Sequence, residues 1–448
     1  MKNKKIKKRI NKNMLLISGI ILFIVPLTFT IKFFSKEEIN SVSILDSVNK
    51  EIKVDEEEND IYNEKGFEEE VVLEQEKNDE FDDRVETIEI AAVGDFLMHM
   101  GVVNSAYNYN TGEYDFTQNL EYVKEYLSSA DLTIANIETT FAGPERGYSG
   151  YPCFNSPDQL VYSMRDVGID IINNISNHSL DTGEKGFLRT RQVIKESGLE
   201  TLGTRGSEEE NRYIIKEIDD IKVGIIGYGY TTEGDEGGRG LNGIPIPENL
   251  FQLMNCFNPD DVDSDLQEMK IQIEKMKKDG ADAIVFYMHW GEEYQLEPNE
   301  SQLKITKFLA NEGVDVIFGD HPHTIQPIDI LKSDDGKHQT VVIYSLGNFI
   351  SNQRQETVGN PYTADGVIVY VKITKDFSTG EVIAHNPEYL PTWIKVMENG
   401  SNVYKVVPSE EYTADYLSSY ESTQALNSFN RTVGVVESYN DAVEVFGQ

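Results

Sequence analysis

From about residue 86 onward, short apolar runs alternate with amphipathic segments, a pattern that predicts buried strands and surface helices. Three strands come first and each precedes a helix: strands 87–95, 131–138 and 170–177, with helices near 117–129, 158–167 and 184–197. Two more helices, near 262–279 and 300–312, precede the apolar runs that lead to His289 and His321. Alternation of this kind predicts an α/β fold with helices outside a mixed sheet system.

The remaining segments predict antiparallel additions to that core. A hairpin is expected over 213–218 and 222–230, and further strands at 328–331, 341–346 and 366–374. Residues 231–260 are rich in Gly, Pro and Asn, and we expect one long loop there. Loops of that length are often functional.

Groups that bind metals stand where the predicted strands stop. The chain has seven histidines, and four of them lie at or directly after strand ends, as do two carboxylates and an amide. In chain order these candidates are Asp95, Glu138, Asn177, His178, His289, His321 and His323. Ligands in open α/β sheets collect at the carboxyl ends of strands, so we expect these side chains to meet.

Together these residues suit a metal-dependent hydrolase. Carboxylate, amide oxygen and imidazole suit Mn, Fe or Zn, and a pair of ions clamps the attacking and leaving oxygens of a displacement. The candidate ligands are Asp95, Glu138, Asn177, His289, His321 and His323. His178 is the candidate acid for a leaving group, and Asp181, three residues later, is the candidate that orients its ring.

Each of these residues alone has a plainer explanation. His321 and His323, on either side of a proline, could be solvated imidazoles in a turn. Asp95 and Asn177 could be turn residues, and Glu138 could cap the next helix. Their shared position at strand ends within one domain favours the metal site over these separate explanations.

The first eighty-five residues differ from the rest of the chain. Residues 1–13 are basic, residues 14–34 form an apolar run, and residues 35–85 are strongly acidic with few aromatic residues. We expect a cytoplasmic tail, a single transmembrane anchor and a disordered tether, with the folded domain outside the cell membrane. The alternatives are a cleaved signal peptide for the apolar run and a docking tail for a basic partner in the acidic segment.

Charge and cysteine content narrow the partners further. The formal net charge is −37, and the chain has no basic patch or basic stripe interleaved with aromatic residues, so no nucleic-acid partner is expected. Cys153 and Cys256 are the only cysteines. We expect two isolated buried thiols, with a single disulfide as the alternative.

Six segments in chain order carry a family resemblance: residues 92–95 (AVGD), 135–139 (ANIET), 176–183 (SNHSLDTG), 288–294 (MHWGEEY), 319–326 (GDHPHTIQ) and 344–349 (YSLGNF). Together they resemble the bacterial CapA family, which is associated with poly-γ-glutamate capsule biosynthesis and belongs to the calcineurin-like metallophosphatase superfamily. The resemblance covers about residues 87–395. It implies a four-layer α/β/β/α sandwich over 86–395, with a C-terminal extension, 396–448, packed on or beside that domain.

The resemblance also implies a role for each candidate residue. Asp95 and His323 would bind a first metal ion, Glu138 would bridge two ions, Asn177, His289 and His321 would bind the second, and His178 would face the substrate.

Two positions depart from the superfamily pattern. This chain has Leu97 where the superfamily has a histidine, and Glu138 where an aspartate is usual. The departures imply a weaker first site, completed by His99 or water, and therefore one ion or two of unequal affinity.

The resemblance implies a membrane-anchored protein of poly-γ-glutamate capsule or envelope-polymer biosynthesis that hydrolyses an anionic envelope phosphoester. The alternative is a non-catalytic metal-binding scaffold or export subunit that assembles with poly-γ-glutamate synthase subunits. Binding of the anionic polymer would need metal bridging or a basic patch around Arg146, Arg189 or Arg191. Hydrolysis of the polymer itself lacks a suitable Ser or Cys nucleophile arrangement.

Overall fold

The computed structural model describes residues 82–234, 238–398, 401–440 and 442–447. They lie in the compact unit Asp79–Gln448. The expected tail, the anchor at 14–34 and nearly all of the acidic tether lie outside the described residues. None of the helices in the described residues combines the length and the hydrophobicity of a membrane span.

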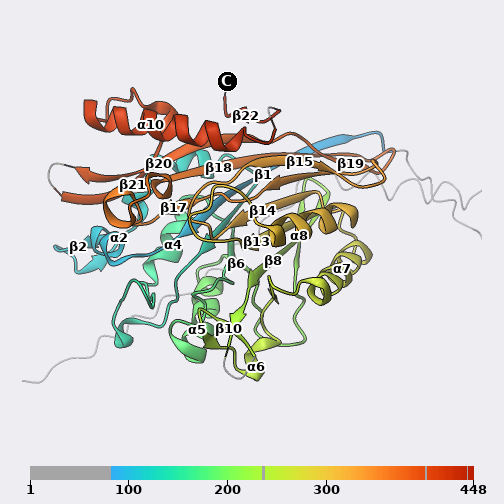
Figure 1. Ribbon diagram of the computed structural model, residues 1–448, viewed down its shortest axis with the longest axis horizontal. Coiled ribbons are helices and arrows are strands. Elements are labelled where there is room, and N and C mark those ends of the chain that lie inside the picture. The colour runs from blue at the N-terminus through green and yellow to red at the C-terminus, as the bar shows by residue number, and fades with distance from the viewer. Residues whose placement is uncertain (1–81, 235–237, 399–400, 441, 448) are drawn as a thin grey trace, which may run out of the picture. The chain divides into compact units, whose positions relative to one another are not determined.

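The first sheet has ten strands among the described residues (Figure 1). Its main path is β21 (Ser401–Pro408), β20 (Glu388–Glu398), β18 (Asp365–Asp376), β1 (Val85–Phe96), β4 (Leu132–Ile137), β5 (Ile171–Asn173) and β6 (Glu200–Leu202). Off this path lie β17 (Asn348–Ile350), β19 (Glu381–Ala384) and β22 (Glu444–Val445). Strands β1, β4, β5 and β6 run parallel, whereas β18 and β20 are antiparallel additions.

The second sheet has seven strands in the described part of the chain. Its path is β12 (Cys256–Phe257), β8 (Ile221–Tyr230), β13 (Ala283–His289), β14 (Val316–Asp320), β16 (Gln339–Ile343) and β15 (Ile328–Lys332), and β7 (Ile214–Ile218) pairs with β8. The hairpin expected over 213–230 and the strand expected at 328–331 are therefore present.

Both sheets are buried on both faces because side chains alternate along each strand. On β1, Ile88 and Ile90 belong to a core that also contains Val285 and Tyr287 of β13, so this core lies between the sheets. The alternate residue Val93 of β1 faces a second core outside the first sheet. Continuous apolar runs in the sequence reflect this double burial.

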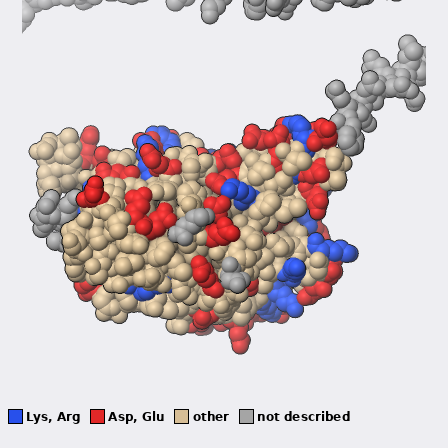
Figure 2. Space-filling model, turned by 90° about the horizontal axis from the view of Figure 1, so that it is seen from above, with Lys and Arg blue, Asp and Glu red and all other residues tan. Residues whose placement is uncertain are grey.

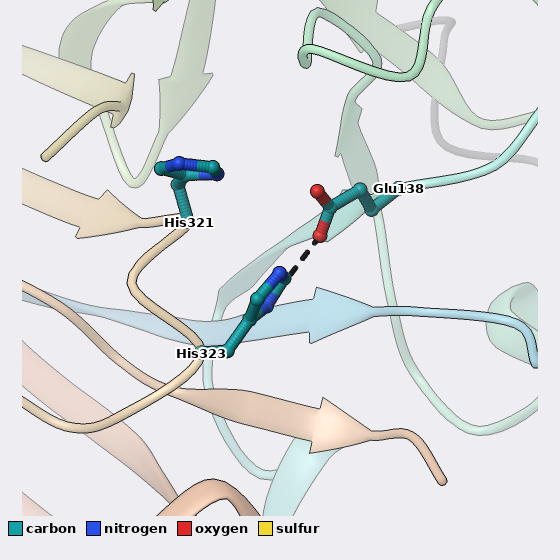
Figure 3. Close-up of side chains that lie close together, drawn as sticks. All are labelled: Glu138, His321 and His323. Carbon is teal, nitrogen blue, oxygen red and sulfur yellow. Dashed lines mark ion pairs between the residues drawn. The ribbon is translucent and has the colours of Figure 1, made fainter. Parts of the chain in front are cut away.

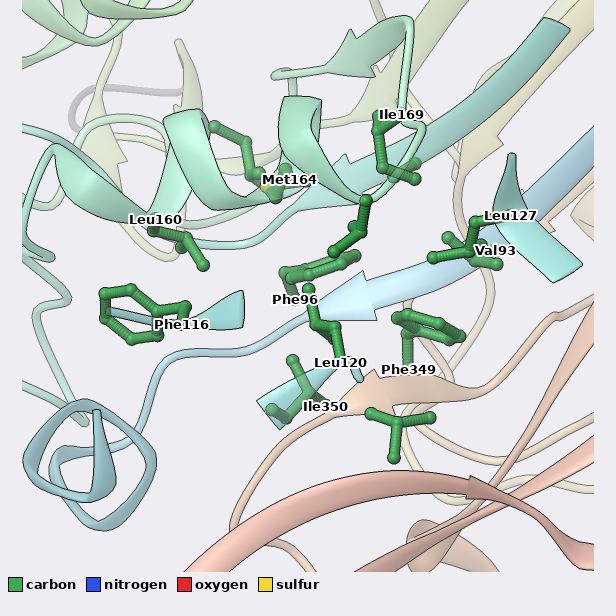
Figure 4. Close-up of a cluster of buried hydrophobic side chains, with 14 of the residues drawn as sticks. Val93, Phe96, Phe116, Leu120, Leu127, Leu160, Met164, Ile169, Phe349 and Ile350 are labelled. Carbon is green, nitrogen blue, oxygen red and sulfur yellow. The ribbon is translucent and has the colours of Figure 1, made fainter. Parts of the chain in front are cut away.

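Helices cover the outer faces. α2 (Met100–Ser105), α4 (Gln159–Asp166) and α5 (Gly183–Glu196) contribute to the core outside the first sheet, and α7 (Asp263–Lys278) and α8 (Glu300–Asn311) to the core outside the second. Figure 4 shows the first of these clusters, where Phe96 and Phe349 pack below Leu160 and Met164 of α4. The fold is a mixed α/β architecture, as expected.

The segment expected as a helix at 117–129 and the two cysteines differ from the sequence expectations. The helix expected at 117–129 is instead a 3-10 turn, η1 (Thr117–Asn119), and a short α3 (Lys124–Leu127). The chain turns there because the Asn119 amide donates to the carbonyls of Val403 and Tyr404, which ties the segment to β21. Cys153 and Cys256 are both free thiols, and Cys153 is exposed rather than buried.

The segment expected as one long loop, 231–260, also contains regular structure. It forms a small sheet of β9 (Thr232–Glu233), β10 (Arg239–Leu241) and β11 (Ile244–Pro245), followed by α6 (Glu248–Phe251) and β12. After residue 395 the chain completes β20, adds β21 at its edge and forms α10 (Ser419–Val436), which contacts β20 and β18.

Candidate metal centre

The candidate residues gather where the two sheets present the carboxyl ends of their parallel strands. Asp95 is the second-last residue of β1, beside Asn136 of β4, and His289 ends β13 beside Asp320 of β14. The register of β1 shifts between Val93 and Asp95, an irregularity that alters which face the following side chains occupy. With the shift, Asp95 comes within 3.9 Å of His289 from the other sheet.

One group of potential ligands comprises Asp95, His289 and Asp320. All three side chains are fully buried, and the ligand atoms lie within 4.8 Å of one another. His289 Nδ1 lies 2.8 Å from Asp320 Oδ1, and the Asn136 amide donates to Asp95 Oδ1 at 2.8 Å. The His321 backbone N–H donates to Asp95 Oδ2 at 3.3 Å, so the Asp95 carboxylate is held from β4 and from the residue after β14.

A second group comprises Glu138, His321 and His323 (Figure 3). Glu138 follows β4, and the two histidines follow β14. His323 Nδ1 lies 3.7 Å from Glu138 Oε2 and 3.3 Å from Asp95 Oδ2, so His323 links the two groups.

Unpartnered polar atoms indicate that these groups suit a cation. Both oxygens of Glu138, Oδ2 of Asp320 and Nδ1 of His321 are buried without any hydrogen-bond partner. Buried polar atoms in folded proteins are almost always paired. Lone pairs left facing one another are the donor set that a divalent metal requires.

The contact between His289 and Asn177 supports the same conclusion. Asn177 Oδ1 lies 2.8 Å from His289 Nε2, while Nδ1 of that ring faces Asp320. A neutral ring carries one N–H, so His289 donates either to Asp320 or to Asn177. The tautomer that donates from Nδ1 to Asp320 leaves an Nε2 lone pair facing the amide oxygen, an arrangement that a bound cation would stabilise, and a carboxylate on the far nitrogen is the usual partner of a ligating histidine.

The electrostatics of the site follow from burial. Burial, and then the charge of Asp95, raise the pKa of Glu138 well above its ordinary value. Burial lowers the pKa of His289 to about 3 and that of His321 well below its ordinary value. The rings are therefore neutral, which is the form that ligates metals.

The backbone around the histidines is strained. His321 and His323 have φ values of 93° and 56°, in a region of backbone conformation that residues other than glycine rarely adopt. Gly319, just before them, fits only without a side chain, because a Cβ there would lie 2.3 Å from the Tyr344 carbonyl oxygen. Strain of this kind persists where surrounding structure holds a functional group in place.

His178 and Asp181 form a hydrogen-bonded pair beside the ligand groups. His178 Nδ1 lies 2.8 Å from Asp181 Oδ2, which also accepts from the Phe154 backbone N–H at 2.6 Å. His178 Nε2 lies 4.0 Å from Glu138 Oε1. The carboxylate orients the ring so that Nε2 points toward the potential ligands.

All eight predicted site residues lie in or beside this centre, and Asp320 is a ninth that sequence reasoning missed. Its signal was present, since Asp320 ends β14 as His289 ends β13. The buried amide of Asn348 belongs to the segment 344–349 of the family resemblance but was not predicted as a site residue; its Oδ1 lies 3.1 Å from His323 Nδ1.

Leu97 and His99, the residues of interest after β1, lie outside both ligand groups. Leu97 is buried in the core. His99 precedes α2, accepts from the Asn352 backbone N–H, and has its pKa lowered to about 4 by burial. Among the described residues, His99 belongs to neither group of potential ligands.

Comparison with known proteins identifies the relatives of this arrangement. Residues 89–353 match the model of a family described as bacterial capsule synthesis protein PGA_cap. The capsule biosynthesis protein CapA of Bacillus anthracis is 28% identical over 60% of this chain and 61% of its own length. The PGA biosynthesis protein CapA of Bacillus subtilis is 24% identical over 57% of this chain and 61% of its own length. The chain thus matches about three fifths of the length of these relatives.

Two solved structures are similar at low identity. A phosphatase from Mycoplasma pneumoniae has 16% identity and a TM-score of 0.40, covering 69% of this chain and 94% of its own. The calcineurin-like phosphoesterase YfkN from Bacillus subtilis has 15% identity and a TM-score of 0.37, covering 78% of this chain and 98% of its own.

Proposed function

The chain belongs to the bacterial capsule synthesis protein PGA_cap family, and from that premise we propose that it is a metal-dependent phosphoester hydrolase of capsule or envelope-polymer synthesis. The polymer proposed is poly-γ-glutamate, by analogy with the CapA relatives named for PGA and capsule biosynthesis. We further propose that residues 14–34 anchor the protein in the cell membrane, with the described domain on the outer side.

One observation carries the proposal: the Glu138 carboxylate is fully buried and neither oxygen has a hydrogen-bond partner. Its surroundings are His323 at 3.7 Å, His289 at 3.8 Å and His178 at 4.0 Å. A buried unpaired carboxylate costs several kcal/mol, so a fold retains one where a cation compensates it.

The residues that would hold divalent ions are Asp95, Glu138, Asn177, His289, His321 and His323, to which the structure adds Asp320. Mn, Fe and Zn all suit this mixture of oxygen and imidazole ligands. When bound, such an ion supplies Lewis-acid stabilisation of a phosphoryl group.

His178 and Asp181 supply the proton chemistry in this proposal. Nδ1 of His178 is engaged by Asp181, so Nε2 is the atom that exchanges a proton with a substrate oxygen. In a phosphoester, that oxygen is the leaving group, and protonating it lowers the barrier to its departure.

The second candidate is a non-catalytic scaffold or export subunit beside poly-γ-glutamate synthase subunits. Direct binding of a polyanion needs basic side chains that are not already in ion pairs. Arg189, however, pairs with Asp158, and Arg191 pairs with Glu210. On the face shown in Figure 2, acidic side chains are scattered widely among uncharged ones and basic ones form small groups. These observations favour the hydrolase over polymer binding by surface charge.

A metal and activity assay tests the proposal. The purified full chain and its His321→Ala variant are analysed for bound metal, and hydrolysis of bis-p-nitrophenyl phosphate is measured with Mn, Zn or Fe added. His385→Ala is the matched control, because His385 is exposed and contacts only Thr374 by its side chain in the described hydrogen bonds. We expect His321→Ala to lose metal and turnover together and the control to keep both.

The outcomes separate the two candidate functions. Bound metal without turnover on any phosphoester would favour the scaffold. Failure to bind metal under every loading condition would contradict the metal centre itself.

A further inference from the structure

The hairpin β10–β11 places an asparagine, Asn242, against two residues of the metal centre. Leu241 pairs with Ile244 across a two-residue turn of Asn242 and Gly243, whose φ values are 48° and 73°. Positive φ at both central residues defines the type I′ turn, and Asn-Gly is its preferred sequence. The Asn242 side chain is exposed, whereas its neighbours in the centre are buried.

The base of the hairpin is held firmly, so the position of its tip is determined by the fold. Leu241 is buried with Leu180 and Phe187 in a small core of its own. Arg239 donates to both oxygens of Asp265 at 3.0 Å, and the Gly243 N–H donates to Thr232 Oγ1 at 3.0 Å.

The Asn242 carboxamide bridges two residues of the centre. Asn177 Nδ2 donates to Asn242 Oδ1 at 3.1 Å, and Asn242 Nδ2 lies 3.3 Å from His178 Nε2. Asn242 Nδ2 also lies 3.5 Å from His178 Nδ1, so the carboxamide lies over the face of the ring and close to Nε2, the nitrogen that Asp181 leaves free. Asn242 thus contacts both a candidate ligand and the candidate acid.

We propose that Asn242 is a substrate-binding and specificity-determining residue, whose amide N–H binds an oxygen of the anionic phosphoester. A leaving-group oxygen that takes a proton from His178 Nε2 must lie beside that atom, and Asn242 Nδ2, 3.3 Å from the same atom, is close enough to donate to a substrate oxygen there. A substrate reaches the buried groups from solvent, and Asn242 is the exposed member of the contact chain that leads to His178. The inference rests on the proposed function for the identity of the substrate.

A plainer explanation is that Asn242 is needed only for the conformation of the turn. A substitution can separate this role from substrate binding, because glycine tolerates positive φ as well as asparagine does. Asn242→Gly therefore removes the amide and keeps the turn, and Asn242→Asp keeps the shape but replaces the donor with a negative charge.

The same chain contains a matched control. The β7–β8 hairpin turns at Asp219 and Asp220 with φ values of 46° and 64°, and Asp219 is exposed. Asp219→Gly makes an equivalent change in an equivalent turn without touching the metal centre.

The test uses the full chain loaded with Mn²⁺. Binding of inorganic phosphate is measured by calorimetry, and kcat and KM are measured on p-nitrophenyl phosphate. We expect Asn242→Gly to weaken phosphate binding and raise KM by about tenfold, the value of one hydrogen bond to a charged group, with kcat nearly unchanged. Asn242→Asp should weaken phosphate binding further, and Asp219→Gly should match the wild type.

Each other outcome has a definite meaning. Equal phosphate affinity in Asn242→Gly and wild type overturns the inference, even if kcat falls, because Asn242 would then only position His178. Absence of phosphate binding in the loaded wild type also overturns it. Phosphate binding that depends on Asn242 without any turnover supports the inference and contradicts the hydrolase proposal.

Discussion

Arg431 on α10 donates to both carboxylate oxygens of Asp365, the first residue of β18, at 2.7 Å each. The Asp365 side chain is only 2% exposed, so this largely buried ion pair connects α10 to β18 of the first sheet. Removing the guanidinium would leave a buried carboxylate without its partner.

We therefore predict that Arg431→Met lowers the free energy of unfolding by about 3–5 kcal/mol, as measured by urea denaturation. Lys372→Met is the control, because the Lys372–Glu388 pair is 48% and 31% exposed and should contribute about 0–1 kcal/mol. Similar losses in both variants would show that the buried pair has no special importance.

Asp315 should make the free energy of unfolding change with pH in the mildly acidic range. Burial raises its pKa from 3.8 to about 6, although the Ile284 backbone N–H and His338 favour the charged form. The folded protein therefore holds a proton that the unfolded chain releases, and stability decreases as the pH rises from about 4 to about 6.

Denaturation of Asp315→Asn at several pH values checks this prediction. The variant should lack that part of the decrease, while the exposed Asp219→Asn should retain it. An identical pH profile in Asp315→Asn and wild type would contradict the assignment.

Glu138→Gln should separate two effects of the Glu138 carboxyl group: destabilisation of the metal-free protein and binding of the metal ion. Without metal, the neutral amide removes repulsion from Asp95 and Asp320, so the variant should melt at a higher temperature than the wild type. With Mn²⁺ at one hundred times its Kd, the wild type should gain about 2.7 kcal/mol and the variant much less. An equal shift of the melting temperature by Mn²⁺ in both proteins would exclude Glu138 as a ligand.

Asp181→Asn should impair the reaction without removing metal. The change takes the charge from the group that orients His178 but leaves every candidate ligand intact. We predict a fall in kcat of about 10–100-fold with unchanged metal content by elemental analysis. Loss of metal in this variant would mean that Asp181 acts through the ligands rather than through His178.

Gly319→Ala should disturb the end of β14, directly before the strained backbone of His321. The added methyl would lie 2.4 Å from Trp290 Nε1 as well as against the Tyr344 carbonyl oxygen, and we predict a loss of about 1–3 kcal/mol by chemical denaturation. Gly434→Ala on α10 is the control, since nothing lies within 4 Å of its Cβ position. That change should instead stabilise the protein by about 0.5–1 kcal/mol.

Much of the fold could be predicted because strand and helix periods are local properties. β13 ends at His289 and α8 spans Glu300–Asn311, close to the expected bounds. The helix expected at 117–129 failed because Asn119 bonds to β21, nearly three hundred residues later, which no local pattern records. The position of the hairpin that carries Asn242 could not be predicted for the same reason. Gly, Pro and Asn predict turns, but they do not predict which residues those turns contact.

The chemical groups at strand ends could be inferred from the order of the amino acids, because an apolar run that stops at a polar residue marks the edge of a sheet. Which of these groups meet at one point could be seen only in the folded chain. A register shift after Val93 accompanies the approach of Asp95 to His289, and Asp320 lies beside His289 because β13 and β14 are neighbours. Such meetings depend on strand pairing and on packing between two sheets, whose contacts join residues far apart in the sequence, such as Asp95 and His289.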